Sequence, residues 1–272
     1  MTCGNSGLCG LWNVATGELL RTFKEHESTV VAAAWFPDGQ RFVTAGYDKR
    51  TVIWDTDGKI LNIVKDLRVH DLVATSDGEY LVSVVSNNVI RIHRMSDDAA
   101  AHIVRSDSMT SLALSPDNQQ LLVNLASHTI NLLSVSTLKE EVDRASGAAI
   151  RPAEPVSRRT ADGTPAAPSG AAAEHDVLVE YMRSLPENCG RFVIRSSFGG
   201  SNSNFVVSGS EDSHVYIWHK DTGNLLEVLA GHSGTVNAVS WNPVYHHLLA
   251  SGSDDRSIRV WISQAASTPQ VQ

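Results

Sequence analysis

The sequence predicts an all-β fold in which short antiparallel sheets repeat as the blades of a β-propeller. Three observations support this prediction: similar phrases recur about every 40 residues, short runs alternate between apolar and polar residues, and turn residues separate those runs. The clearest repeat relates "EHESTVVAAAWFPDG" (25–39) and "RFVTAGYDKRTVIWD" (41–55) to "GHSGTVNAVSWNP" (231–243) and "LLASGSDDRSIRVW" (248–261). A phrase that repeats indicates repeated architecture rather than one chemical site.

The period of the repeat follows from the end of the third strand expected in each unit. That position falls at Trp12, Trp54, His93, Leu133, Trp218 and Trp261. The intervals between successive positions are 42, 39, 40, 85 and 43 residues. The interval of 85 residues is one period plus an insertion. Within the units, "TVNAVSW", "HLLASGS", "SIRVW" and "LLEVLAG" are typical of short strands, and "FPDG", "TSDG" and "SPDN" are typical of tight turns.

Counting the expected strands gives four complete blades and two partial ones within residues 1–263. The complete blades are predicted at about 29–65, 68–105, 108–183 and 191–229. The first unit lacks an innermost strand, and the last, at 235–262, lacks an outermost strand. We therefore expect the chain to represent part of a larger propeller.

Two segments interrupt or follow this rhythm. Residues 137–176 are rich in Ala, Pro, Ser and Gly, and residues 264–272 are small and polar. Such segments bury too little apolar surface to offset the entropy of ordering, so both are predicted to be disordered. Residues 177–184, "VLVEYMRS", are predicted to be the delayed fourth strand of the interrupted blade.

Composition narrows the function classes. The net charge of −8 argues against general nucleic-acid or anionic-membrane binding, which needs basic surface. No apolar run approaches the roughly 20 residues of a membrane span, and no signal peptide is evident, so we expect a cytoplasmic or nuclear location, or both. The three cysteines form no disulfide framework, and Cys3 and Cys9 read as ordinary thiols rather than zinc ligands.

A set of His, Ser or Thr, Asp and Trp recurs at matching positions. It comprises His26, Thr44, Asp48 and Trp54 in one unit, and His232, Ser251, Asp255 and Trp261 in the last unit. These positions resemble the WD-repeat family, in which such residues form a buried hydrogen-bonded relay within one blade. Physical chemistry agrees, because buried polar groups need partners and Trp supplies only a donor. A third unit keeps Ser208, Asp212 and Trp218 without the His.

A His–Ser–Asp set also suggests a serine hydrolase. The set occurs twice at structural spacing, however, and no nucleophile elbow accompanies it. No phosphate-cradling loop, metal cluster or paired-carboxylate constellation is present, and adjacent His residues in "VYHH" point apart on a strand. We therefore predict a structural relay, no enzyme activity, no metal or other cofactor, and no small-molecule substrate.

The C-terminal third carries a narrower resemblance. The combination of "SSFGG", "SGSED", "VYIWHK" and "GHSGTVNAVSWNP" is similar to the WD-repeat subunit of the GID/CTLH ubiquitin-ligase complex, and "LWNVATGELL" and "AAWFPDGQRFVTAGYDK" fit the same family. The resemblance implies a scaffold that links ligase assemblies and helps present substrates for ubiquitination and proteasomal degradation, while separate RING subunits supply the chemistry. In that family, helical LisH and CTLH segments precede the propeller; this sequence departs from the pattern there.

Residues that bind other molecules commonly lie on loops held by a rigid frame. Exposed Arg and aromatic residues often contribute most of the binding energy at protein–protein interfaces. The turn before each third strand should reach one rim of the disc. The candidate partner-binding residues there are Tyr47, Lys49, Arg50, Ser213, His214 and Arg256.

Three alternatives to this scaffold remain. A substrate receptor of a cullin-type ligase usually carries Trp-Asp-x-Arg at the end of a third strand, but "WDTD", "WISQ" and "WHKD" all lack the Arg. A generic WD-repeat scaffold in another complex would share the fold. A truncated product without a stable fold would show no cooperative melting transition.

Overall fold

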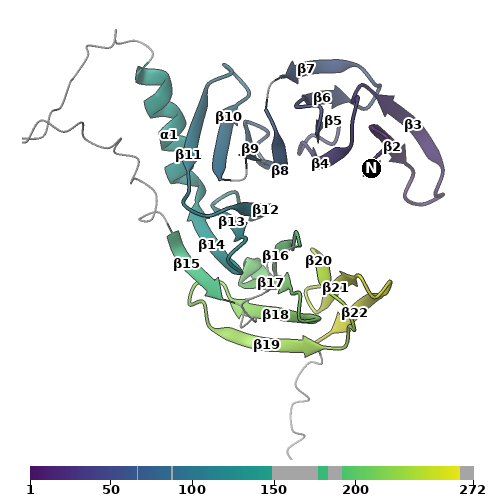
Figure 1. Cartoon of the computed structure of the whole chain (residues 1–272), viewed down its shortest axis with the longest axis vertical. Helices are drawn as coiled ribbons and strands as arrows, with labels where there is room; N and C mark the ends of the chain where they lie inside the picture. The colour runs from purple at the N-terminus through teal and green to yellow at the C-terminus, as the bar shows by residue number, and fades with distance from the viewer. Residues whose placement is uncertain (66, 87, 149–176, 183–191, 264–272) are drawn as a thin grey trace, which may run out of the picture. The chain divides into compact units, whose positions relative to one another are not determined.

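The computed structural model describes residues 1–65, 67–86, 88–148, 177–182 and 192–263 (Figure 1). Strands within these residues form six antiparallel sheets, four of them with four strands and two with three. Each sheet is built from consecutive strands of the chain. This confirms the predicted all-β, β-propeller class with four complete and two partial repeat units.

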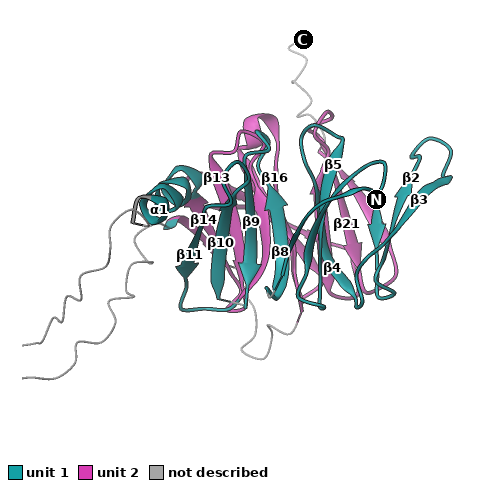
Figure 2. Cartoon of the chain, turned by 90° about the horizontal axis from the view of Figure 1, so that it is seen from above, with its two compact units in different colours: residues 1–108, 134–177 teal, residues 109–133, 178–272 magenta. Residues whose placement is uncertain are grey.

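The chain divides into two compact units (Figure 2). Unit 1 comprises residues 1–108 and 134–177 and holds three sheets. The first sheet has β1 (Thr2–Cys3), β2 (Leu8–Trp12) and β3 (Leu19–Lys24). The second has β4 (Val30–Trp35), β5 (Arg41–Gly46), β6 (Thr51–Asp55) and β7 (Ile60–Val64), and the third has β8 (Val69–Ala74), β9 (Tyr80–Val85), β10 (Val89–Arg94) and β11 (Ala100–Val104).

Unit 2 comprises residues 109–133 and 178–272 and holds the other three sheets. Its first sheet has β12 (Met109–Leu114), β13 (Gln120–Leu125), β14 (Thr129–Ser134) and β15 (Val177–Met182). The next has β16 (Ser196–Gly199), β17 (Phe205–Gly209), β18 (His214–His219) and β19 (Leu225–Ala230), with a short 3-10 turn (Ser201–Ser203) after β16. The last has β20 (Val236–Trp241), β21 (Leu248–Ser253) and β22 (Ile258–Ile262). The delayed fourth strand predicted at 177–184 is β15.

Burial follows strand position within each sheet. The second strands β5 and β9 are buried on both faces, whereas the outer strands β3 and β19 are mostly exposed. First strands of neighbouring sheets pack against one another: β4 against β8 in unit 1, and β16 against both β12 and β20 in unit 2. Sheets that meet through their innermost strands are typical of propeller blades.

The turn between the first and second strands explains the recurring Asp-Gly and Asp-Asn signals. Asp38 accepts hydrogen bonds from the backbone N–H groups of Gln40 (2.9 Å) and Arg41 (3.0 Å). The residue after the turn aspartate, Gly39 or Asn118, has a positive φ of 63° or 58°. These conformations favour Gly and tolerate Asn, so the sequence pattern encodes the turn directly.

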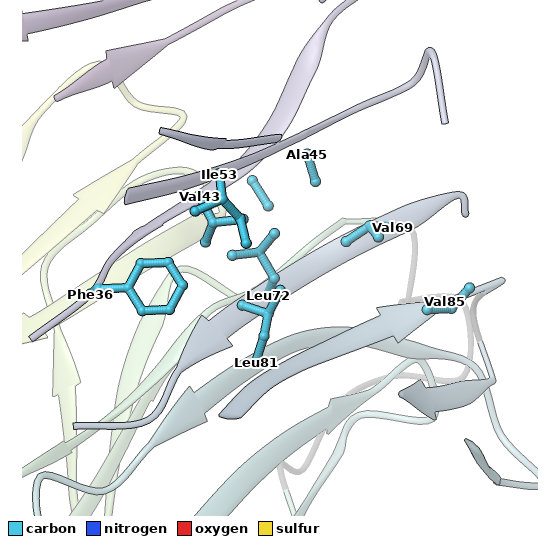
Figure 3. Close-up of a cluster of buried hydrophobic side chains, with 9 residues drawn as sticks. Phe36, Val43, Ala45, Ile53, Val69, Leu72, Leu81 and Val85 are labelled. Carbon is cyan, nitrogen blue, oxygen red and sulfur yellow. The ribbon is translucent and has the colours of Figure 1, made fainter. Parts of the chain in front are cut away.

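A cluster of buried apolar side chains holds two sheets of unit 1 together (Figure 3). Side chains from β5 and β6 meet those from β8 and β9, and Phe36 lies just beyond β4. The labelled members are Phe36, Val43, Ala45, Ile53, Val69, Leu72, Leu81 and Val85. Burial of this kind supplies the main stabilising term for neighbouring sheets.

Third strands of the complete and partial sheets differ in the burial of their apolar side chains. In β6, the third strand of a complete sheet, four of five residues are buried. In β22, the third strand of the last sheet, Ile258, Val260 and Ile262 are 80%, 63% and 66% exposed. Val52 and Trp54 of β6 pack in a cluster with side chains of the first sheet, and Ile53 packs in a cluster with side chains of the third, so the neighbouring sheets cover β6 on both faces.

A helix corrects part of the predicted disorder. Helix α1 (Val135–Ala148) includes residues 137–148, which begin the segment expected to be disordered; residues 149–176 and 264–272 lie outside the described residues. Val135, Leu138 and Val142 are buried and recur at helical spacing. Three apolar residues at this spacing were enough to give the helix a buried face, although the composition of the whole segment is polar.

Polar contacts fix α1 on the third sheet of unit 1, where it packs against β10 and β11. The Lys139 ammonium lies 3.1 Å from Asp77 Oδ2 and 4.7 Å from the centroid of the Tyr80 ring. At the next turn, Asp143 pairs with Arg94. The inserted helix is therefore part of the sheet's structure. No helix among the described residues has the length and apolar character needed to cross a membrane.

Candidate functional site

The relay predicted in the second repeat unit is present as a chain of hydrogen bonds. His26 Nδ1 lies 2.9 Å from Asp48 Oδ2, and His26 Nε2 lies 2.8 Å from Thr44 Oγ1. Trp54 Nε1 donates to the same Thr44 oxygen at 2.9 Å. A carboxylate only accepts, so His26 Nδ1 carries a proton and donates it to Asp48. The His26 and Asp48 side chains are 1% and 5% exposed, which leaves neither group open to a substrate.

Asp48 also organises the turn between β5 and β6. Its carboxylate accepts hydrogen bonds from the backbone N–H groups of Glu27 and Arg50, both at 3.1 Å. A Cβ atom at Gly46 would lie 2.6 Å from both His26 Nδ1 and Asp48 Oδ1, so this position needs glycine for the ring and the carboxylate to meet. The relay therefore fixes the loop before β4 and the turn after β5.

The last repeat unit contains the same relay. His232 bonds to Asp255 Oδ2 through Nδ1 and to Ser251 Oγ through Nε2, each at 2.8 Å, and Trp261 Nε1 donates to Ser251 Oγ at 2.8 Å. Ser257 adds a hydroxyl donor to Asp255 at 2.6 Å. This hydrogen bond from Ser257 holds the pKa of the Asp255 carboxyl far below its usual range, so the carboxylate is ionised.

The third predicted set, Ser208, Asp212 and Trp218, has different hydrogen-bond partners. The Ser208 hydroxyl donates to the carbonyl of Gly209 at 3.0 Å, and Asp212 accepts from the hydroxyl of Tyr216 at 2.5 Å. The Tyr216 ring stacks on Trp218 with 5.7 Å between centroids. Burial opposes ionisation of Asp212, yet the Tyr216 hydrogen bond leaves the pKa of its carboxyl below the usual value.

Tyr216 is therefore the side-chain partner of Asp212, as His26 and His232 are the partners of Asp48 and Asp255. Sequence reasoning missed it because Tyr216 lies on the third strand rather than in the loop before the first. The available signal was an aromatic hydroxyl two residues before Trp218, in the one Asp-containing unit that lacks the histidine.

A second missed network lies in unit 2, in a sheet without the relay. The Asn124 amide donates to Ser111 Oγ (2.6 Å) and to the carbonyl of Ile194 (2.8 Å), and Ser111 donates to that same carbonyl at 2.9 Å. Asn124 and Ser111 are buried. These bonds tie β12 and β13 to the segment that enters β16.

In the third sheet, His93 stands where other units have the relay tryptophan. It is buried, and its Nε2 lies 3.1 Å from Asp98 Oδ1. Burial lowers the pKa of His93, and the nearby Arg91 guanidinium lowers it further, while Asp98 opposes both. The net effect favours the neutral imidazole in the folded protein.

We expect this histidine to make unit 1 sensitive to acid. Because its pKa is lower in the folded state, the unfolded chain binds the proton first, so stability falls as the pH drops below about 6.5. His93→Gln should reduce the loss of thermal stability measured by circular dichroism between about pH 7.5 and about pH 5.5. His70 and His102, whose pKa values burial also lowers, should leave a residual dependence. Equal losses in variant and wild type would contradict the assignment.

Five of the six candidate rim residues lie in the turns between second and third strands, and the sixth, His214, begins β18. Lys49, Ser213 and Arg256 share a left-handed backbone, with φ values of 60°, 72° and 67°. Each directly follows the aspartate of the turn between the second and third strands. Each turn closes with a backbone hydrogen bond of similar length, as from Lys49 N–H to the carbonyl of Gly46 (3.2 Å). His128, with φ of 71°, holds the same position in another sheet and was not selected from sequence.

The rim residues differ in how free their side chains are. In unit 1, Tyr47 is 51% exposed with the Arg68 guanidinium 5.7 Å from its ring centroid, while Arg50 pairs with Glu27 at 2.8 Å and Glu25 at 3.5 Å. Of the other four candidates, Lys49 lies in unit 1, and Ser213, His214 and Arg256 lie in unit 2. Lys49 and Arg256 are exposed, Ser213 is half-buried, and His214 Nδ1 is tied to the Asp212 carbonyl at 2.9 Å. Tyr47, Lys49 and Arg256 are therefore the most accessible candidates.

Over the residues that the structure describes, no group of three or more His, Cys, Asp or Glu side chains is arranged to hold a metal ion. The histidines and aspartates of the relay are instead committed to one another and to turn backbone.

The repeated sheets and the relay define a WD-repeat protein. The family model "WD domain, G-beta repeat" matches residues 17–55, 194–219 and 223–261, so these residues form WD repeats. It is similar over nearly its whole length to proteins that include a GID complex subunit, which confirms the resemblance to the WD-repeat subunit of the GID/CTLH complex.

Three relatives illustrate that similarity. The chain is 34% identical to the WD repeat-containing protein 26 homolog of Arabidopsis thaliana, over 96% of the chain and 38% of the relative. It is 36% identical to the WD repeat-containing protein WDS homolog of the same plant, over 96% and 44%. It is 30% identical to GID complex subunit 7 of Schizosaccharomyces pombe, over 90% and 42%. The chain thus spans about two fifths of the length of these relatives.

Proposed function

We propose that this chain is a non-catalytic scaffold of a GID/CTLH-type ubiquitin ligase, which links ligase assemblies and presents substrates for ubiquitination and proteasomal degradation. The observation that carries the proposal is the 30% identity to GID complex subunit 7 over 90% of the chain. The relay supports the non-catalytic part, because its imidazoles and carboxylates are buried and occupied by structural hydrogen bonds.

The partners in this proposal are other subunits of the ligase and its substrates. The turns between second and third strands supply the contacts, since a rigid sheet holds each turn in place while its side chain stays free to vary. The few cysteines favour a reducing compartment, so we propose that the protein acts in the cytoplasm, the nucleus or both.

The left-handed rim positions offer variants that remove a side chain without disturbing the fold. We expect Lys49→Gly to leave the free energy of unfolding unchanged or to raise it by up to about 1.5 kcal/mol. Glycine relieves the strain of about 1–2 kcal/mol at a positive φ, while it adds about 0.4–1 kcal/mol of entropy to the unfolded chain. Denaturant unfolding measures the difference, and a loss well above 1 kcal/mol would show that the Lys49 side chain supports the turn.

The proposal is tested by affinity purification of the chain from its own cells, followed by mass spectrometry. We expect LisH/CTLH-type and RING-type proteins to co-purify, and we expect the Lys49→Gly, Arg256→Gly double variant to recover less of them. Asn118→Gly is the matched control, because Asn118 is also left-handed but lies in the turn between a first and a second strand.

Other outcomes of the same purification discriminate between functions. Recovery of a cullin with its adaptor, in place of RING and CTLH-type proteins, would favour the cullin-receptor alternative. Recovery of neither, from a chain that melts cooperatively, would overturn the ligase assignment and leave a WD-repeat scaffold of another complex. Recovery dominated by chaperones, with no cooperative melt, would identify a chain that does not fold stably by itself.

A further inference from the structure

Two cysteines face each other across the first pair of strands. Strand β1 pairs with β2 in a register that sets Cys3 directly opposite Cys9 and Thr2 opposite Gly10. Directly opposite residues of an antiparallel pair have Cβ atoms about 4.5–5.5 Å apart, which approaches the 3.5–4.5 Å of a disulfide. A small approach of the strands therefore brings the sulfurs within bonding distance.

The two thiols differ in environment. Cys9 is 2% exposed and packs in the apolar cluster with Phe23, Phe42 and Trp54, whereas Cys3 is only partly buried at the edge of that cluster. The hydrogen bond from Cys9 lowers the pKa of Cys3, and the same bond raises the pKa of Cys9. One partner is thus accessible and more readily ionised, and the other is sheltered beside it with its proton.

Strand β1 is also the least securely held strand of this sheet. It pairs with β2 through two residue positions, supported by a hydrogen bond from Trp12 Nε1 to Thr2 Oγ1 at 2.8 Å. Just after β1, the carbonyl of Gly4 accepts from the N–H of Val30 at 3.2 Å. A covalent link between Cys3 and Cys9 therefore changes the restraint on β1 more than it would change any longer strand.

We propose that Cys3 and Cys9 form a peroxide-sensitive modification site that closes into a reversible disulfide between β1 and β2. The Cys3 thiolate attacks an oxygen of hydrogen peroxide, the O–O bond breaks, and Cys3 becomes a sulfenic acid as water leaves. The Cys9 sulfur then attacks the Cys3 sulfur, the S–O bond breaks, and a second water leaves with the Cys9 proton. Two thiols and one peroxide thus give one disulfide and two waters, and a small-molecule thiol reverses the change.

The expected consequence is local. The disulfide closes a loop of only a few residues, so the gain in global stability is small. Hydrogen exchange of the backbone amides in β1 and in the turn that follows should slow instead, because the strand can no longer separate from β2.

The test uses the full chain with Cys189→Ser, so that only the two paired thiols remain. After peroxide treatment of the folded protein, we expect the peptide that contains both residues to be lighter by two hydrogen atoms and to resist maleimide until a reductant is added. Before treatment, Cys3 should react with maleimide roughly tenfold or more faster than Cys9. With Cys9→Ser, the sulfenic acid on Cys3 should persist and be trapped by dimedone.

Two results would overturn the proposal. The first is a peptide that keeps both free thiols under peroxide conditions that oxidise cysteines in the unfolded chain. The second is oxidation of each cysteine separately, to sulfinic acid or to a glutathione adduct, with no internal link. Both readouts come from the peptide with native Cys3 and Cys9, so the proposal stays testable even if the Cys9→Ser variant fails to fold.

Discussion

Gly209→Ala is expected to destabilise the protein by about 1–3 kcal/mol, the range typical of overpacking in a filled interior. A Cβ atom at Gly209 would lie 2.1 Å from the carbonyl oxygen of Val236, which belongs to the backbone of β20. That strand is itself fixed by a hydrogen bond from the Val236 N–H to the carbonyl of Ser210 at 2.9 Å. Backbone cannot move aside as a side chain would, so the two strands must separate.

Gly252→Ala is the matched control, because Gly252 also follows the relay serine in its own sheet. A Cβ atom there meets nothing within 4 Å. Alanine in a strand interior is also favoured over glycine by roughly 0.5–1 kcal/mol, so we expect stability to hold or rise. Urea unfolding followed by tryptophan fluorescence compares the two variants. Equal losses would mean that the approach of β17 to β20 does not limit packing.

Asp48→Ala is expected to lower the free energy of unfolding by about 1–3 kcal/mol, because it leaves the buried His26 Nδ1–H without its acceptor. The turn also loses the acceptor of the Glu27 and Arg50 backbone N–H groups. Thermal and denaturant unfolding measure the loss. Asp57→Ala, at an exposed turn, is the control and should stay within about 0.5 kcal/mol of wild type.

A double-mutant cycle with His26→Ala separates the relay from the turn. We expect a coupling of about 0.5–3 kcal/mol between the two substitutions, because both remove the same hydrogen bond. Unchanged stability together with lost partner recovery would instead place Asp48 in a binding site, which would refute its structural role.

The repeat predicted most of the fold because each blade is encoded locally. Turn signals such as "FPDG" set the first hairpin of a unit, and the Trp spacing sets the period, so strand order follows without knowledge of distant contacts. Helix α1 was not predicted, because the spacing of Val135, Leu138 and Val142 indicates a helix only when the sheet that buries these side chains is known. The composition of residues 137–176, rich in Ala, Pro, Ser and Gly, predicted disorder for the whole segment instead.

The same distinction applies to the candidate site. The relay around His26 and the one around His232 were predictable, since the family pattern states which residue types meet. The Asn124 network was not, because it depends on the carbonyl of Ile194, a backbone group 70 residues away that any residue type would supply. The contact of Tyr216 with Asp212 lies between these cases. The sequence shows a tyrosine near Trp218, but it does not show that its hydroxyl bonds to Asp212.

The left-handed position in the turns between second and third strands carries side chains of different chemistry. Lys49, His128, Ser213 and Arg256 share one backbone geometry, yet they carry an ammonium, an imidazole, a hydroxyl and a guanidinium. The geometry tolerates any of these side chains at similar strain, so selection on the blade does not constrain which one is present. Under the proposed role of these turns in partner binding, descendants of one gene could exchange partners by single substitutions at these positions while the blades and the relay stay unchanged.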